Sequence, residues 1–144
     1  MKGYNLKDKF RFLILVGILI TINAYANEDY YKALGANDKV KELYYFTKAC
    51  DEGHGYSCFS LGHIYSKEIS FVKQNKLKAL KYYDKACEMN VFQSCSTVGY
   101  AYQYGEVLEK DMKKALQYYQ KACDGGDDRG CKNKDRLNYK GSTK

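Results

Sequence analysis

The residues best suited to chemistry in this chain are six regularly spaced cysteines. They are Cys50 and Cys58, Cys87 and Cys95, and Cys123 and Cys131. The members of each pair are eight positions apart, and successive pairs follow at steps of 37 and 36 residues. Such thiols form disulfides, bind metals or stay reduced in a core. Zinc sites usually contain two cysteines roughly two to four positions apart. Because the chain has no Cys-x-x-Cys, we expect disulfides and neither a metal nor another cofactor.

A disulfide between cysteines eight positions apart requires the chain to reverse between them. On one straight helix their Cα atoms would lie about 12 Å apart, whereas a disulfide needs less than about 7 Å. Gly53, Asn90 and Gly126 each follow the first cysteine of a pair by three positions. Gly and Asn tolerate the left-handed backbone that ends a helix, so each pair should close one helical hairpin. The expected bridges are Cys50–Cys58, Cys87–Cys95 and Cys123–Cys131. Reduced core thiols are the alternative.

The sequence around the cysteines repeats with the same period. Residues 76–87 read KLKALKYYDKAC, residues 112–123 read MKKALQYYQKAC, and a looser copy at 39–50 reads KVKELYYFTKAC. Within each copy the apolar positions have helical spacing, as Leu80 and Tyr83 do. A fixed period of this length is typical of repeat architectures. We therefore predict an all-α fold, an αα-hairpin repeat solenoid with one disulfide per repeat.

Candidate helix caps divide the chain into units. Asp38, Asn75 and Asp111 come directly before the repeated helices, where a side-chain oxygen accepts a hydrogen bond from the first turn. The third unit has polar residues where the others have Leu/Val-Gly-x-x-Tyr, as a terminal repeat requires. The expected units are a capping helix at 27–38, repeats at 39–75, 76–111 and 112–138, the last serving as a C-terminal cap, and a tail at 139–144.

The first 26 residues have the three parts of a secretory signal peptide. Basic residues predominate in positions 1–11, positions 12–22 carry no charge, and Ala24-Tyr25-Ala26 is a small-x-small cleavage site. The uncharged segment would span only about 16 Å as a helix, roughly half of the hydrocarbon core, which disfavours an uncleaved anchor. We expect cleavage after Ala26 and a secreted or periplasmic protein without a stable membrane anchor.

Length and composition restrict the function classes further. The chain has 144 residues, of which 45% are apolar and 28% charged, with a net charge of +7, no Pro, no Trp and 16 Tyr. These values fit one globular domain, and they exclude a multi-pass membrane protein, a collagen-like fibre and a large multidomain enzyme. Because the leader carries part of the positive charge, the mature chain is only mildly basic. Export and this modest charge argue against a nucleic-acid partner.

The repeated residues resemble the Sel1-like repeat, a relative of the tetratricopeptide repeat, and more narrowly the Helicobacter cysteine-rich protein family. The shared elements are Lys-Ala-Leu-x-Tyr-Tyr-x-Lys-Ala-Cys, the Gly or Asn turn, the second Cys and Leu/Val-Gly-x-x-Tyr, over about 38–138. The resemblance implies an exported solenoid with one bridge per repeat that acts as an interaction scaffold. It also implies penicillin binding with slow hydrolysis of β-lactams.

A β-lactamase needs catalytic groups, and the chain offers one incomplete set. A serine β-lactamase uses a nucleophilic Ser one helical turn before a Lys, with further Ser-Asp-Asn and Lys-Thr-Gly elements. The single Ser-x-x-Lys consists of Ser70 and Lys73, in an expected connector, and both other elements are missing. The sequence therefore leaves open whether the protein is an enzyme. If it is one, the expectation is a β-lactamase with Ser70 and Lys73 as catalytic candidates.

Tyrosines on the expected second helices are the candidates for ligand binding. Tyr65, Tyr100, Tyr102 and Tyr104 are more than a small core absorbs, and Tyr supplies contact area at low entropic cost. Repeat packing alone is the other interpretation of these residues. The predicted function is an exported module that binds a peptide, a protein or a peptidoglycan fragment of the cell wall. The alternative is a weak β-lactam-binding or β-lactam-hydrolysing protein.

Overall fold

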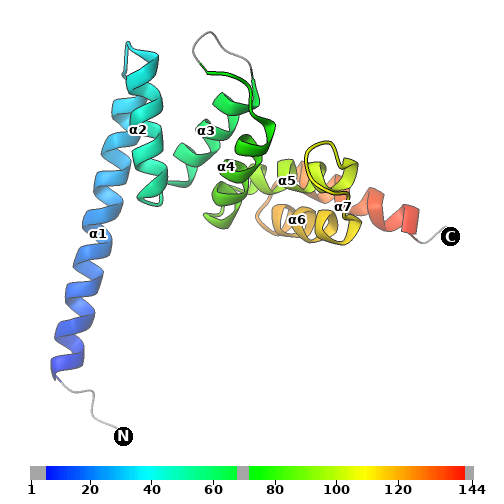
Figure 1. Cartoon of the computed structure of the whole chain (residues 1–144). Coiled ribbons are helices and arrows are strands. Elements are labelled where there is room, and N and C mark those ends of the chain that lie inside the picture. The colour runs from blue at the N-terminus through cyan, green and yellow to red at the C-terminus, as the bar shows by residue number, and fades with distance from the viewer. Residues whose placement is uncertain (1–5, 68–71, 142–144) are drawn as a thin grey trace, which may run out of the picture. The chain divides into compact units, whose positions relative to one another are not determined.

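A computed structural model describes residues 6–67 and 72–141, and the regular elements of these residues are seven α-helices (Figure 1). The predicted all-α hairpin architecture with one disulfide in each repeat is confirmed. The chain divides into two compact units, residues 1–54 and residues 55–144. The boundary falls in the first predicted repeat, between its two helices.

The first unit consists of two helices that pack against each other, α1 (Leu6–Leu34) and α2 (Lys39–Asp51). Small side chains on α1 allow this contact, since Ala26 and Ala33 are both 1% exposed. Phe46 of α2 is also buried. The C-terminal part of α1 overlaps the expected capping helix, which therefore belongs to a longer element.

The N-terminal part of α1 exposes apolar side chains. Leu13 is 65% exposed and Ile20 is 64% exposed. The helix continues without interruption through the expected cleavage site after Ala26. Apolar surface of this kind costs free energy in water. In the part of the chain that the structure describes, no helix has the length and apolar character that crossing a membrane requires.

The second unit contains five helices that pack in chain order. They are α3 (Gly55–Ser66), α4 (Lys76–Glu88), α5 (Phe92–Tyr104), α6 (Met112–Asp124) and α7 (Asp128–Gly141). Each helix contacts the next one along the chain, and α5 also contacts α7. One core cluster joins α4 and α5 and includes Leu80, Tyr83 and Val98. α4 and α6 are thus the first helices of their repeats, and α5 and α7 are the second helices.

Side-chain caps begin the first helices where the sequence predicts them. Asp38, Asn75 and Asp111 each have extended backbone angles, and each accepts a hydrogen bond from a backbone N–H of the following turn at 2.8 to 2.9 Å. Such a bond satisfies a donor that the helix itself leaves unpaired. The caps fix the residue at which α2, α4 and α6 begin.

Turns with positive φ reverse the chain between paired cysteines. Asn90 has a φ of 62° and Gly126 a φ of 88°. The bridges closed by these turns are Cys87–Cys95, with Cα atoms 4.8 Å apart, and Cys123–Cys131, with Cα atoms 4.5 Å apart. Cys50 and Cys58 are disulfide-bonded as well, so the described residues include no free cysteine. The bridges Cys87–Cys95 and Cys123–Cys131 each covalently hold the turn of their hairpin.

Glycines on α3 and α5 let a tyrosine ring of the next helix come close. A Cβ atom on Gly62 would lie 2.6 Å from two ring carbons of Tyr83, and one on Gly99 would lie 2.9 Å from two ring carbons of Tyr119. Carbon atoms that are not bonded prefer a separation of about 3.5–4.0 Å, so a larger residue would force the ring to move. Both rings are buried, and these contacts determine how closely successive helices pack.

A buried hydrogen bond accompanies the second of these contacts. Tyr119 has no exposed surface, and its hydroxyl donates a hydrogen bond to Oε1 of Gln103 at 2.7 Å. Burial raises the pKa of Tyr119 to about 12. The hydroxyl is therefore neutral at physiological pH and acts as a donor within the core.

Replacing this tyrosine should cost stability and change its dependence on pH. We expect Tyr119→Phe to lower the free energy of unfolding by about 1–3 kcal/mol near neutral pH, because Gln103 loses its buried donor. In the parent protein, stability should also fall as the pH rises from about 10 to about 12, since Tyr119 ionises first in the unfolded state. Urea unfolding near pH 8 and near pH 11 measures both effects. An equal loss at high pH in parent and variant would contradict the role of Tyr119.

Candidate binding cleft on the first helices

Two of the four candidate tyrosines take part in repeat packing. Tyr65 stacks on Tyr82 with ring centroids 5.6 Å apart, and Tyr102 stacks on Tyr118 with centroids 5.7 Å apart. In both stacks a lysine ammonium of the next first helix lies over the second-helix ring, 3.9 Å and 5.1 Å from its centroid. A cation over an aromatic face is attracted by the electrons of the ring. These half-buried tyrosines therefore join consecutive helices.

The other two candidate tyrosines remain on the surface. Tyr100 and Tyr104 are 47% and 48% exposed, and their rings lie 4.4 Å apart one turn from each other on α5. Tyr102 lies between them in sequence and therefore on another side of the helix. The four candidates are thus divided between a packing contact and an exposed pair.

The described part of the chain includes only one of the two candidate catalytic residues. Ser70 lies outside the described residues, and Lys73 is exposed in the connector between α3 and α4. His63 packs edge-on against Phe59 with ring centroids 4.7 Å apart, and burial lowers its pKa. The described residues contain no cluster of three or more His, Cys, Asp or Glu side chains that could bind a metal.

A cleft lies on α4 and α6 and consists of two adjoining hollows. The smaller, of about 290 Å³, is lined by Asp84, Cys87, Glu88, Gln117, Tyr118 and Lys121. The larger, of about 660 Å³, is lined by Asn90, Phe92, Leu116, Gln117, Gln120, Lys121, Asp124 and Gly125. Gln117 and Lys121 line both hollows, so we treat them as one site and call it the α4/α6 cleft.

Helical spacing places polar side chains along the cleft. Asp84 and Glu88 are four residues apart on α4, and Gln117 and Lys121 are four residues apart on α6. Residues with this spacing share one face of a helix. The opposite face of α4 packs into the core, where Tyr83 and its neighbours are buried. The same helices that form the core therefore carry the cleft on their remaining face.

A hydrogen bond joins the two walls of the smaller hollow. The hydroxyl of Tyr118 on α6 donates to Oδ1 of Asp84 on α4 at 2.6 Å. Burial raises the pKa of Tyr118, and the hydrogen bond to Asp84 raises it further. The hydroxyl therefore stays protonated at neutral pH and keeps one oxygen of Asp84 occupied. This bond fixes the separation of the two walls at this point.

The other polar groups of the cleft differ in whether they already form a hydrogen bond. Gln120 donates a hydrogen bond to Asp124 at 2.6 Å along the exposed side of α6. The side chains of Glu88 and Lys121, in contrast, form no hydrogen bond or ion pair with any other described residue. Phe92 adds a half-buried apolar side chain to the larger hollow. The cleft thus combines carboxylates, amides, one ammonium and apolar surface, which suits non-covalent binding of a polar chain.

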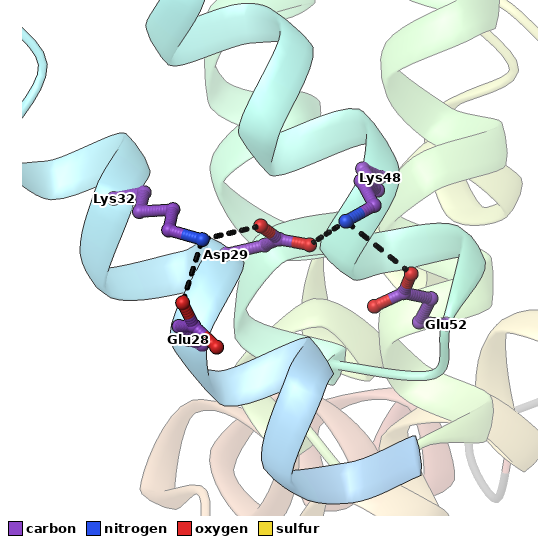
Figure 2. A network of polar contacts seen from close by, with 5 residues as sticks. All are labelled: Glu28, Asp29, Lys32, Lys48 and Glu52. Carbon is purple, nitrogen blue, oxygen red and sulfur yellow. Dashed lines mark hydrogen bonds and ion pairs between the residues drawn. The ribbon is translucent and has the colours of Figure 1, made fainter.

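The first unit has a polar network that holds the lysine corresponding to Lys121. Asp29 of α1 is 2% exposed, and its Oδ2 lies 2.5 Å from Nζ of Lys48 on α2. Its Oδ1 lies 3.8 Å from Nζ of Lys32. Figure 2 shows Asp29 between these two lysines. The hydrogen bond to Asp29 raises the pKa of Lys48. A buried carboxylate therefore orients this lysine of α2, whereas Lys121 of α6 has no ion pair among the described residues.

The tyrosines predicted as a ligand surface lie on the second helices, whereas the α4/α6 cleft lies on first helices and was not predicted from the sequence. The sequence does contain a related pattern. Asp84 and Glu88 are four positions apart, and so are Gln117 and Lys121. This spacing places each pair on one exposed face of its helix. Such a pattern is also typical of an ordinary solvated face. The hollow between α4 and α6 depends on how these helices pack. It alone distinguishes a binding face from an ordinary solvated face.

The comparisons with solved structures agree on the fold. The chain is similar to a Sel1 repeat protein from Oxalobacter formigenes, with a TM-score of 0.72 and 22% identity over 78% of this chain and 34% of that chain. It is also similar to c5321, a protective antigen of uropathogenic Escherichia coli with an SLR fold, with a TM-score of 0.62 and 21% identity over 85% of this chain and 26% of that chain. This chain therefore spans only about a third and a quarter of these two proteins.

A third structure matches along nearly its whole length. Helicobacter pylori cysteine rich protein B has a TM-score of 0.65 and 28% identity, over 90% of this chain and 97% of that chain. No curated protein matches the chain. The family model of the Sel1 repeat matches residues 43–54, 55–91 and 93–127, which together make up more than half of the sequence. This chain belongs to the Sel1 repeat family.

Proposed function

We propose that this protein is an exported interaction module that binds a peptide segment of another protein in the α4/α6 cleft. The observation that carries the proposal is the pair of adjoining hollows that share Gln117 and Lys121. Their amide, ammonium and carboxylate groups complement the donors and acceptors of an extended peptide backbone. Phe92 and Leu116 offer apolar contact to its side chains. This combination is typical of binding sites.

Rigidity of the walls supports binding at this cleft. Cys87 lines the smaller hollow and is bridged to Cys95 of α5, and Tyr118 is bonded across to Asp84. A site held in its binding conformation before the ligand arrives loses little entropy on association. The bridges thereby favour recognition as well as stability.

Export is the second part of the proposal, with the leader removed after Ala26. The exposed apolar side chains of α1, such as Leu13 and Ile20, support it, since an exported chain would lose them with the leader. The bridged cysteines support it too, because disulfides persist mainly outside the cytoplasm. N-terminal sequencing of the protein recovered from the periplasm or the medium should begin at Asn27.

Filling the cleft should abolish peptide binding. Gln117 is exposed and lines both hollows, so Gln117→Trp inserts an indole between them without disturbing the core. Peptides selected from a random display library on the oxidised protein should bind this variant at least about tenfold more weakly, as expected for loss of a central contact. Fluorescence anisotropy with the selected peptides measures the affinity.

Lys132→Trp is the matched control, because Lys132 is exposed on α7 and lines neither hollow. Its affinity for the selected peptides should equal that of the parent protein. Selected peptides that bind Gln117→Trp as tightly as the parent would show that binding occurs elsewhere. If purified peptidoglycan fragments bind selectively at the cleft, the ligand is a cell-wall fragment and not a peptide segment of another protein.

The narrower resemblance to the Helicobacter cysteine-rich proteins is part of this proposal as well. The similarity to cysteine rich protein B along nearly its whole length supports it, together with the paired cysteine spacing. The β-lactam activity that this resemblance implies stays a prediction, because no contact of the described residues favours it. Exposed Lys73 is the described member of its candidate pair.

A further inference from the structure

The charge of the α4/α6 cleft differs in sign from that of the whole chain. The chain carries a net charge of +7. The cleft is lined by three carboxylates, Asp84, Glu88 and Asp124, against the single ammonium of Lys121. A cleft lined by one sign of charge concentrates ligands of the opposite sign and disfavours others. The lining therefore complements a cationic ligand.

The three carboxylates are not equally available. One oxygen of Asp84 accepts the hydrogen bond from Tyr118, and Asp124 accepts one from Gln120. Glu88 is exposed, and its carboxylate has neither a hydrogen bond nor an ion pair with another described residue. A ligand cation would thus find the unoccupied carboxylate of Glu88 in the smaller hollow, with Asp84 four residues away on the same helix face.

We propose that the cleft selects peptide segments that carry a Lys or Arg side chain, and that Glu88 binds this cation. The inference rests on the proposed function and names the chemistry of its ligand. Lys121 and Gln117 lie between the two hollows and donate to carbonyl groups of the peptide backbone. Phe92 and Leu116 in the larger hollow contact an apolar side chain of the same segment. A basic residue near an apolar one is therefore the recognised pattern.

Neutralising one carboxylate tests the proposal. A random dodecapeptide display library is selected in parallel on the oxidised parent protein and on Glu88→Gln, which keeps the size and the hydrogen-bonding oxygen of the side chain. The parent should enrich Lys and Arg relative to the starting library, and Glu88→Gln should not. Synthetic peptides from the parent selection should bind Glu88→Gln about 10- to 100-fold more weakly, the range of one charge-assisted hydrogen bond.

A matched control separates a local effect from one of net charge. Glu106→Gln makes the same change at an exposed residue between α5 and α6 that lines neither hollow. Its selected peptides and affinities should equal those of the parent. Equal weakening by Glu106→Gln and Glu88→Gln would overturn the proposal, because the attraction would then be a property of the whole surface.

The remaining outcomes distinguish the failure of this inference from the failure of the proposed peptide-binding function. If the selected peptides are not enriched in Lys or Arg and Gln117→Trp fails to bind them, the inference is overturned and the cleft remains a peptide site. Peptides that Gln117→Trp binds normally would overturn both. Tighter binding at Glu88 of a peptidoglycan stem peptide with a free side-chain amine would overturn the assignment to a protein segment.

Discussion

Removing the Cys87–Cys95 bridge by the double substitution to Ala is expected to lower the free energy of unfolding by about 2–5 kcal/mol, the usual cost of losing a native disulfide from a small domain. Both sulfur atoms lie in the core, where the two cysteines are 1% and 0% exposed and pack against Ala122 of the next repeat. The substitution therefore loosens one hairpin and weakens its contact with its neighbour. Urea unfolding of the oxidised proteins, followed by circular dichroism, measures the loss.

The terminal bridge provides the comparison. Cys123 and Cys131 are partly exposed, and their hairpin has no further repeat packed on its outer side among the described residues. Their double substitution to Ala should therefore cost less than that of the central pair. A larger loss from the terminal pair would contradict the importance of the buried central bridge.

Gly62→Ala is expected to destabilise the protein by about 1–3 kcal/mol, as overpacking of a core typically does. The added methyl group would lie 2.6 Å from two ring carbons of Tyr83, and this ring is only 6% exposed. Helix propensity acts in the other direction, since Ala is favoured over Gly by about 1 kcal/mol within a helix. The sign of the measured change in unfolding free energy thus decides which effect is larger. A gain in stability would show that the ring moves at little cost.

Two further variants identify the contact responsible. At Gly35 an added Cβ would have its nearest neighbour at 3.6 Å, so Gly35→Ala should change stability by less than about 0.5 kcal/mol. Combining Gly62→Ala with Tyr83→Leu removes the ring that the methyl group meets. The two changes should then be non-additive, with a smaller joint loss than the sum of the single losses.

Much of the fold could be predicted because local signals and the repeat period agree. Asp38, Asn75 and Asp111 cap the helices, and Asn90 and Gly126 adopt the expected left-handed turns. Each of these features depends only on residues a few positions away. The cysteine pairs add a covalent requirement that restricts the hairpins to one arrangement.

The candidate site was less predictable because it depends on which helix faces remain uncovered. Tyr65 and Tyr102 look like Tyr100 and Tyr104 in the sequence, and only the position of Tyr82 and Tyr118 on the adjacent helices separates the half-buried, stacked rings from the exposed ones. Likewise, the partner of Tyr118 is Asp84, 34 residues earlier in the chain. Neither pairing can be read from a helical period alone.

The two stacks of Tyr65 on Tyr82 and of Tyr102 on Tyr118 also bear on how such a chain can evolve. Their ring separations are 5.6 and 5.7 Å, and each includes a lysine at the same position of its helix. Because the same three residue types meet at both places, duplicating or deleting one repeat in the gene restores the same kind of contact and demands no new interface. The number of repeats can then change in single genetic steps, while each repeat continues to depend only on its neighbours.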